Sequence, residues 1–513
     1  MRKIITLSLV ASTTLLFSST ASDLKFMKTE IANLKSEVAE LKKDKQKSQK
    51  KIAKISKKLN KVKAHDANDN IKWNVDLRTS VNSINYDLAD GSSKSNDALL
   101  GMRLWLNMAY AVDTNNIFKA RLSMNKAFGA DFGSEGGRSH GLGEMFDWTG
   151  NTSLSDSHLK VSEAYWLYLG EEAFGANIPW TFSIGRRPST TGFLANLRED
   201  DPASSPLGHI INVEFDGFSS KLDLSNITNI PGMSFKVCMG RGSSSATPLF
   251  ETATTYADDA LENVDLTGFI FEPYNDGQYI VKSTWFKAFN MPGMDMNPDG
   301  TPTQFKQFGD IQGASISVLI DGLTEDGYLS EAKLFGSFAW TQTEPEAGKS
   351  MLGSFDKESG TSYWVGAEFP LTDNGKFGLE YNHGSEYWRP FTYAEDTMIG
   401  SKLAVRGDAI EAYFTYKLTD ALSAQIRYTK IDYDYTGSNG FFGNYSGNSM
   451  KIDDIKSAVS AVNNMGGMEN VMSAVENGDM SMEQATQLGM ANEMAPNIIE
   501  SAQDIRFYIR YRF

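Results

Sequence analysis

The last nine residues of the chain, 505–513, read IRFYIRYRF. Apolar and aromatic side chains occupy every second position, and polar or basic side chains alternate with them: Ile505, Phe507, Ile509, Tyr511 and Phe513 against Arg506, Tyr508, Arg510 and Arg512. Successive side chains of a β-strand point to opposite faces. The pattern therefore predicts a final strand with one apolar face and one strongly basic face.

The same period of two recurs along most of the chain. Seven other stretches alternate in this way: 71–78, 100–110, 118–124, 180–184, 316–320, 363–369 and 410–418. Strands of about ten residues with one apolar face and aromatic ends are typical of a transmembrane barrel.

The connections between these stretches alternate in length. Short turns are predicted at 113–116, 170–179, 226–231, 273–277, 321–328, 370–375 and 419–421. Long polar loops are predicted at 89–98, 129–157, 188–209, 241–262, 290–308, 344–360, 386–406 and 437–502. Fifteen connections join sixteen strands. Short turns on the periplasmic side and long loops outside are the outer-membrane arrangement. We therefore predict an all-β fold, a transmembrane antiparallel β-barrel over 71–513.

Two segments of the predicted barrel depart from simple alternation. Residues 210–225, where Gly217 breaks the alternation, hide either a bulge or two shorter strands. The long extracellular loop 437–502 reads as partly helical, with one apolar face at Ile452, Ile455, Val459 and Val462 and another at Met468, Val471, Met472 and Val475.

The N-terminus differs from the rest. Residues 1–21 combine Arg2-Lys3, an apolar stretch and small residues before Ala21, which predicts a signal peptide. Residues 22–63 carry apolar residues every three or four positions, which predicts a basic α-helical coiled coil in the periplasm. Its mixture of Ile, Val and Leu is compatible with a trimer. Residues 64–70 form a linker.

Composition excludes several classes of protein. After the first twenty residues no apolar run approaches the roughly 18 residues of a membrane-spanning helix, which excludes a helical membrane protein. The single cysteine, Cys238, excludes an internal disulfide and a cysteine zinc cluster. A formal net charge of −15 argues against a nucleic-acid partner.

The C-terminal strand ending in Phe513 resembles the signal that the barrel-assembly machinery recognises in bacterial outer-membrane proteins. The residues that carry this resemblance are Phe507, Ile509, Tyr511 and Phe513. The whole chain resembles an uncharacterised family of porin-like proteins. This resemblance implies a bacterial outer-membrane location, contact with outer-membrane lipids, a homotrimer, and contact between the basic coiled coil and peptidoglycan.

Residues that alternate with the apolar positions are predicted to face the lumen. On the last two strands and the first three they form a largely basic wall: Lys72, Arg78, Arg103, Lys119, Arg121, Arg427, Arg506, Arg510 and Arg512, against Asp76 and Asp504. These cations either line the water path or are balanced by ordinary loop acids. In general porins the third loop folds inward with its acids toward a basic wall. That resemblance implies a constriction formed by Arg187, Arg198, Glu199, Asp200, Asp201, Arg506 and Arg510.

Two other motifs are candidates for chemistry. Asp295, Asn297 and Asp299 match the first half of a calcium loop, but Lys306 stands where the bidentate Glu belongs, and a plain surface turn is the favoured interpretation. His383 and Ser385 resemble the pair of an outer-membrane phospholipase, or else His383 belongs to the interfacial belt. Other enzyme motifs are missing from the sequence, so we expect no enzyme and no cofactor apart from calcium.

The leading functional interpretation is a porin for passive diffusion of small hydrophilic solutes or ions. The alternatives are a substrate-selective transporter, a tether between outer membrane and cell wall, and a lipase.

Overall fold

The computed structural model describes residues 71–129, 154, 157–188, 191–244, 262–296, 302–392, 397–438, 440–443 and 447–513. The predicted signal peptide, coiled coil and linker lie outside these residues.

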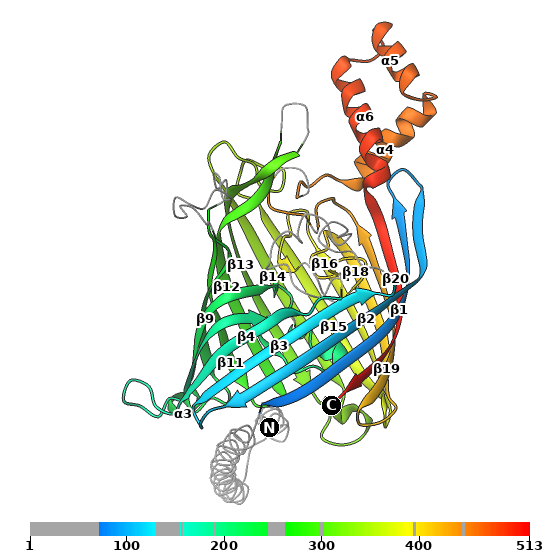
Figure 1. Cartoon of the computed structure of the whole chain (residues 1–513). Coiled ribbons are helices and arrows are strands. Elements are labelled where there is room, and N and C mark those ends of the chain that lie inside the picture. Colours follow the sequence, from blue (N-terminus) through cyan, green and yellow to red (C-terminus); the bar gives the residue numbers. More distant parts are fainter. Residues whose placement is uncertain are drawn as a thin grey trace, which may run out of the picture. The chain divides into compact units, whose positions relative to one another are not determined.

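Within the described residues, sixteen strands form one closed antiparallel barrel (Figure 1). In barrel order they are β1 (Lys72–Leu88), β2 (Ser93–Ala111), β3 (Asn116–Ala127), β4 (Lys160–Gly170), β5 (Trp180–Pro188), β9 (Glu214–Asp223), β10 (Ser234–Ser243), β11 (Val264–Asn275), β12 (Tyr279–Met296), β13 (Pro302–Asp321), β14 (Lys333–Pro345), β15 (Ser359–Thr372), β16 (Gly375–Gly384), β18 (Gly407–Lys417), β19 (Leu422–Tyr433) and β20 (Ile499–Arg512). Pairing of β1 with β20 closes the barrel. The predicted fold class and strand number are confirmed.

The alternation predicted for the last strand is also confirmed. On β20 the side chains of Phe507 and Ile509 remain exposed on the outside, whereas Arg506, Tyr508 and Arg510 are at most 3% exposed. The apolar exterior continues around the barrel, for example at Ile316, Phe338 and Val365. An apolar exterior on a closed barrel suits a lipid environment.

Two predicted long loops are wrong. Residues 89–98 are mostly strand, because β1 ends at Leu88, β2 begins at Ser93, and Gly91 (φ 84°) allows a tight turn between them. Residues 290–308 are likewise mostly the paired ends of β12 and β13. Residues 93–98 read as a loop because this end of β2 carries polar residues on both faces, whereas 290–308 reads as a loop because several Pro and Gly residues interrupt its alternation.

The stretch 210–225 contains two strands, one of the two predicted alternatives. The short β8 (Ile211–Asn212) precedes β9 and pairs in parallel with β17 (Phe391–Thr392) instead of joining the barrel. Just before it, β6 (Gly192–Phe193) pairs in parallel with β7 (Ser204–Leu207). We name residues 191–213 the infolded loop. Its short strands β6, β7 and β8 form parallel pairs that are not part of the barrel sheet.

The infolded loop packs into an apolar core inside the barrel. This core joins the loop to inward-facing strand residues and to the connections after β16 and β19: Leu194, Leu207, Ile210, Val213, Phe286, Ile311, Trp364, Trp388, Phe391, Leu403, Phe441 and Phe442. All of them are fully or almost fully buried. Part of the lumen is therefore filled by protein.

Three helices lie between β19 and β20: α4 (Ile452–Asn464), α5 (Met468–Glu476) and α6 (Met482–Met494). The predicted apolar face of α4 is confirmed, since Ile452, Ile455, Val459 and Val462 are all buried. Shorter helical turns are α3 (Ser225–Thr228), η3 (Leu197–Glu199), η4 (Tyr328–Ser330) and η5 (Ala495–Asn497). None of the helices in the described part of the chain has the length and hydropathy of a membrane-spanning helix.

Candidate functional site: a luminal ion-pair cluster

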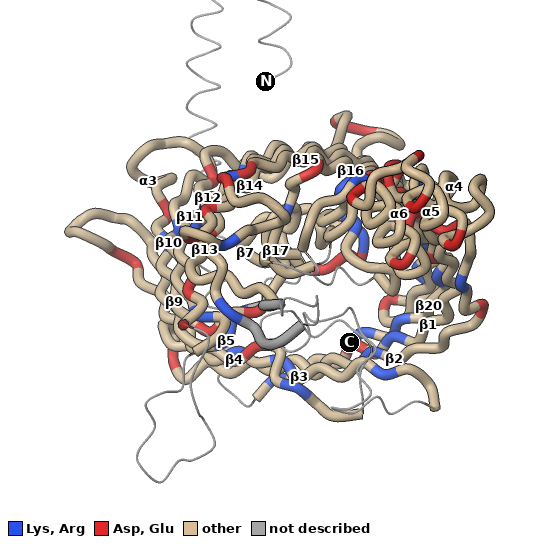
Figure 2. The backbone as a smooth tube through the Cα atoms, turned by 90° about the horizontal axis from the view of Figure 1, so that it is seen from above, with Lys and Arg blue, Asp and Glu red and all other residues tan. Residues whose placement is uncertain are grey.

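The strand register gathers arginines from distant parts of the sequence. Arg103, Arg78 and Arg510 occupy directly paired positions on β2, β1 and β20. Arg427 and Arg506 are paired in the same way on β19 and β20. Seen along the barrel, basic segments lie side by side on β20, β1 and β2 (Figure 2). All five side chains are at most 4% exposed. Like charges on paired positions repel, so this wall needs carboxylates close to it.

A tight turn in the infolded loop supplies two of these carboxylates. The 3₁₀ turn η3 ends at Asp200, whose backbone is left-handed (φ 53°). The Asn196 side chain donates to the Asp201 carbonyl (2.9 Å), and the Asp201 N–H donates back to the Asn196 carbonyl (3.1 Å). The turn buries Arg198 and Glu199.

Glu199 is held by several partners from the barrel wall. The Tyr508 hydroxyl donates to its carboxylate at 2.6 Å. Arg427 Nη1 lies 3.3 Å from the same carboxylate and Arg78 Nη1 lies 3.7 Å from it. A carboxylate this deeply buried is tolerated because both its charge and its hydrogen bonding are satisfied.

Arg510 links the loop to the wall. Its Nη2 donates to Asp201 Oδ1 (2.7 Å) and its Nη1 donates to the Glu199 carbonyl (2.7 Å). On the wall itself, Arg510 Nε donates to Asp76 (3.0 Å), which also accepts from Arg103 (3.4 Å). Charge-assisted contacts of this kind are the stronger class of hydrogen bond.

A second group of charges adjoins the first. Glu411, on β18, accepts from Arg198 (2.9 Å) and from Lys402 (2.6 Å). Lys402 also donates to Glu380 on β16 (2.5 Å). We name the buried members of this network the luminal ion-pair cluster: Asp76, Arg78, Arg103, Arg198, Glu199, Asp201, Glu380, Lys402, Glu411, Arg427 and Arg510. Its six cations and five carboxylates nearly balance.

Two further residues fix the infolded loop. Asp200 forms an ion pair with Lys376 (2.7 Å). Burial acts to raise the pKa of Asp200, but the charge and hydrogen bond of Lys376, together with the charges of Lys417 and Lys333, hold this pKa below its usual range. His209 is fully buried and its two ring nitrogens hydrogen-bond to Ser337 (2.8 Å) and Ser362 (2.9 Å). Burial lowers the pKa of His209 to about 3, so this imidazole is neutral at physiological pH.

Most of the residues predicted to form the constriction meet at this place. Arg198, Glu199, Asp201 and Arg510 belong to the cluster, and Asp200 lies next to it. They touch one another directly, and the contacts tie the loop to the wall.

Arg187 lies away from the cluster, and Arg506 lies at its edge, paired with Arg427 across β19 and β20. Arg187 donates to Ser219 (3.4 Å) and lies over the Tyr165 ring (4.4 Å), because its strand is on another part of the wall. Arg506 donates to Asn82 (2.6 Å).

The predicted basic wall divides into two parts. Arg78, Arg103 and Arg427 lie in the cluster, and Arg512 contacts Asp201 (3.1 Å). Lys72 and Lys119 are exposed. Arg121 is half-buried, donates to Asn107 (2.6 Å) and stacks on Trp105.

The sequence interpretation missed Glu411, Lys402 and Tyr508. Glu411 and Tyr508 could have been found, since each alternates with outward-facing apolar neighbours on its strand. Lys402 lies in the connection before β18, where no periodicity marks the side that a residue faces.

The two smaller motifs have different outcomes. Asn297 and Asp299 of the candidate calcium loop lie outside the described residues, and of Asp295 only the backbone, at the end of β12, is described. Elsewhere in the described ranges, no group of three or more His, Cys, Asp or Glu residues is placed to hold a metal ion.

The candidate lipase pair is not joined by a hydrogen bond in the described structure. His383 Nδ1 instead lies 2.9 Å from Asp408, and the Ser385 hydroxyl accepts from the Thr361 N–H (2.9 Å).

The fold and the cluster together define a porin-like β-barrel: closed, apolar outside, charged inside, and with one loop folded into its lumen. The chain belongs to the DUF3373 family, described as a protein of unknown function, whose family model matches residues 93–477. No curated protein matches the chain.

Several solved structures are similar to this chain. An anion-selective porin from Comamonas acidovorans is 13% identical, with a TM-score of 0.43 over 86% of this chain and 99% of the porin. OprB of Pseudomonas putida is 10% identical, with a TM-score of 0.44 over 86% and 94% of the two chains. The outer membrane channel DcaP of Acinetobacter baumannii is 12% identical, with a TM-score of 0.39 over 86% and 97%. These scores describe a distant likeness in fold.

Proposed function

We propose that the protein is an outer-membrane porin through which small hydrophilic solutes or ions diffuse passively. The observation that carries this proposal is the division of the lumen. Near β19, β20 and β1 the inward side chains are buried beneath the infolded loop, as at Arg427 and Arg510. On β3 and β4 the inward Lys119 is exposed, and Arg121 and Glu163 are half-buried. Water therefore reaches a charged inner surface that the loop leaves uncovered.

The ion pairs of the cluster support this function by holding the loop away from the water path. Charges facing a narrow aqueous path raise the local concentration of ions of opposite sign. Because Lys119 and Arg121 face that path, we expect them to contribute more to ion selectivity than the nearly balanced cluster.

We also propose the assembly that goes with this function. The signal peptide exports the chain, the C-terminal strand guides it to the barrel-assembly machinery, and the coiled coil joins three copies in the periplasm, where its basic surface contacts peptidoglycan. The observations in support are the heptad pattern of residues 22–63 and the outward apolar row ending at Phe513.

The test is conductance of the purified protein in planar lipid bilayers. A porin gives stepwise openings, and replacing both Lys119 and Arg121 by Gln should shift the reversal potential toward cations. The shift should fade in 1 M salt, where charges are screened beyond roughly 3 Å.

A matched control is Lys357→Gln, a lysine on the connection between β14 and β15 whose side chain is 62% exposed. It should leave the reversal potential unchanged. A silent barrel would contradict the porin proposal and favour the tether.

A further inference from the structure

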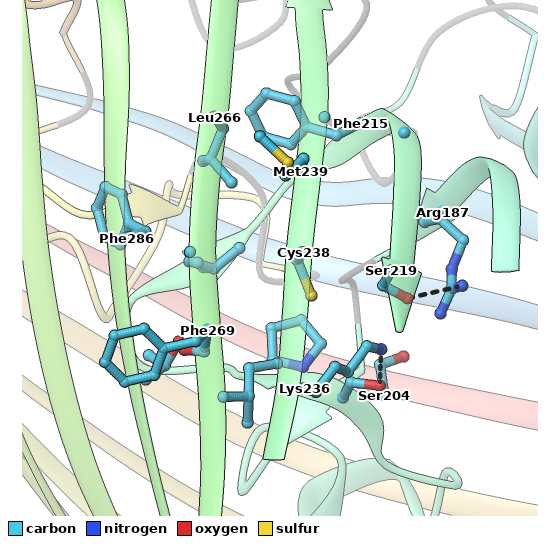
Figure 3. A pocket seen from close by; sticks show the side chains of 18 of the residues that line it. Arg187, Ser204, Phe215, Ser219, Lys236, Cys238, Met239, Leu266, Phe269 and Phe286 are labelled. Atoms are coloured by element: carbon cyan, nitrogen blue, oxygen red, sulfur yellow. Dashed lines mark hydrogen bonds between the residues drawn. The ribbon is translucent and has the colours of Figure 1, made fainter. Parts of the chain in front are cut away.

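A second site lies on the inner surface of the barrel, away from the ion-pair cluster. A cavity of about 290 Å³ is bounded by strands β4, β5 and β9–β12 and by the second half of the infolded loop (Figure 3). No residue of the cluster lines it.

Missing side chains create the hollow. Gly217 and Gly240 are paired across β9 and β10, and Gly268 on β11 is paired with Cys238 on β10. A Cβ atom on Gly217 would lie 2.1 Å from the Met239 carbonyl oxygen, and one on Gly268 would lie 2.4 Å from that of Trp285. Larger residues are therefore excluded from two of these three positions, and the wall stays concave.

One end of the cavity is cationic. Lys236 is only 8% exposed, and its ammonium donates to Ser205 Oγ (2.7 Å). In the part of the chain that the structure describes, no carboxylate forms an ion pair with it, although an ammonium has three donors. Arg187 also lines the cavity. Glu163 is the one carboxylate in the lining, so the lining carries a net positive charge.

The other end of the cavity is apolar. Phe215, Leu266 and Phe286 are separated from Lys236 and Ser219 by Cys238 (Figure 3). Arg187 is paired with Phe215 across β5 and β9, but its guanidinium is directed to Ser219. Ile211 and Val213 of the infolded loop extend the apolar surface. A ligand that satisfies both ends must carry a negative charge and an apolar body.

We propose that this cavity binds small carboxylates whose apolar body is one aromatic ring or a short alkyl chain. The carboxylate lies against Lys236 and Arg187, and the apolar body lies between Phe215, Leu266 and Phe286. A buried ammonium without a carboxylate gains most from an anionic ligand, since a buried charge is costly unless it is paired. This site gives the proposed porin a solute class. Binding in the cavity does not depend on the porin function, but passage of these carboxylates through the barrel rests on it.

The chain carries its own reporter of binding, because Cys238 is its single cysteine and lines the cavity. We would measure the rate at which N-ethylmaleimide, a neutral reagent, modifies Cys238 in protein reconstituted in nanodiscs. Phenylacetate at ten times its dissociation constant should slow this reaction on the order of tenfold. The neutral 2-phenylacetamide and the cationic 2-phenylethylammonium should not slow it at the same concentration.

Two variants separate a specific site from a general electrostatic effect. Lys236→Met should weaken phenylacetate binding roughly 10- to 100-fold, as expected for loss of a charged hydrogen-bond donor. Lys221→Met is the matched control: Lys221 is paired with Lys236 across β9 and β10 but does not line the cavity. In Lys221→Met, phenylacetate should protect Cys238 from N-ethylmaleimide about as well as it does in the parent.

Equilibrium dialysis of radiolabelled phenylacetate against the same nanodiscs gives a second measurement that does not depend on the reactivity of Cys238. The proposal is overturned if the parent binds no more phenylacetate than Lys236→Met does. It is also overturned if phenylacetamide protects as well as phenylacetate, or if Lys221→Met loses as much binding as Lys236→Met. Binding in a barrel that gives no conductance would sustain this site and refute the porin. Conductance without phenylacetate binding would sustain the porin and refute this site.

Discussion

Replacing Glu199 by Gln tests whether the ion pairs hold the infolded loop in the lumen. The substitution keeps the size of the side chain but removes the charge that faces Arg427 (3.3 Å) and Arg78 (3.7 Å). Removing one partner of a buried ion pair typically costs about 3–5 kcal/mol, because the other charge is left uncompensated. At about 1.4 kcal/mol per factor of ten, the ratio of docked to undocked loop should fall roughly 100- to 3000-fold.

Hydrogen–deuterium exchange of the loop amides measures this ratio directly. The Asp201 N–H donates to the Asn196 carbonyl within the docked loop, so it exchanges when the turn opens. In Glu199→Gln, peptides covering 191–213 should exchange faster by the factor above, while those of β13–β15 should not change. Tyr508→Phe removes the 2.6 Å hydrogen bond but no charge, and should cause a smaller acceleration, roughly 10- to 100-fold.

The control is Glu325→Gln, an exposed carboxylate on the turn between β13 and β14. The loop amides of this variant should exchange at the parent's rate. If the loop of Glu199→Gln also exchanges at the parent's rate, the ion pairs do not determine docking, and the apolar core around Leu194 and Ile210 holds the loop alone.

Three further predictions concern pH, assembly and oligomerisation. The pKa of His209 falls from an ordinary 6.5 to about 3 on burial, so its contribution to docking is complete above pH 6.5 and declines by about 1.4 kcal/mol per pH unit as the pH falls toward 3. When the pH is lowered from about 7 to about 5, the single-channel current noise of the parent should therefore rise, whereas that of His209→Asn should not. Equal noise in the parent at both pH values would contradict this. Phe513 exchanges two backbone hydrogen bonds with Val75 (3.0 and 3.1 Å), and its deletion should leave exported but unassembled protein. Heat-modifiable barrel in the outer membrane after this deletion would be evidence against a terminal signal. Replacing Ile31, Leu34, Val38 and Leu41 by Asp should weaken the oligomer but spare each barrel, because a closed barrel has no edge strand to lose. An oligomer that survives in native electrophoresis would mean that the barrels associate by themselves.

The barrel and its basic wall could be predicted from sequence because both depend on a period of two. Once Ile505 and Phe507 are assigned to the outside, Arg506 and Arg510 must face inward, and closure places Arg510 beside Arg78 and Arg506 beside Asn82. The signal is strong because water and an apolar environment meet opposite faces of the same strand.

The partners of that wall were indicated only by the resemblance of the third loop to that of general porins, because no periodic pattern marks them. The contact between Asp201 and Arg510 depends on a reversal of the chain at Asp200 and on apolar packing within the lumen, neither of which leaves a periodic trace. The cavity beside Lys236 was missed for a related reason, since it is formed by the lack of side chains at Gly217 and Gly268.

The helices between β19 and β20 have a consequence for how the barrel is completed. Ala89, at the turn between β1 and β2, packs in one cluster with Ile452 and Ile455 of α4, and its N–H donates to the Ile498 carbonyl just before β20 (2.9 Å). These contacts join the two ends of the barrel sequence, whose meeting carries the largest loop-closure cost in the chain. They lie at the end of the seam along which β1 and β20 pair. Docking of α4 on the β1–β2 turn therefore adds side-chain packing and a backbone hydrogen bond to the seam between β1 and β20, beyond the pairing of the two strands themselves.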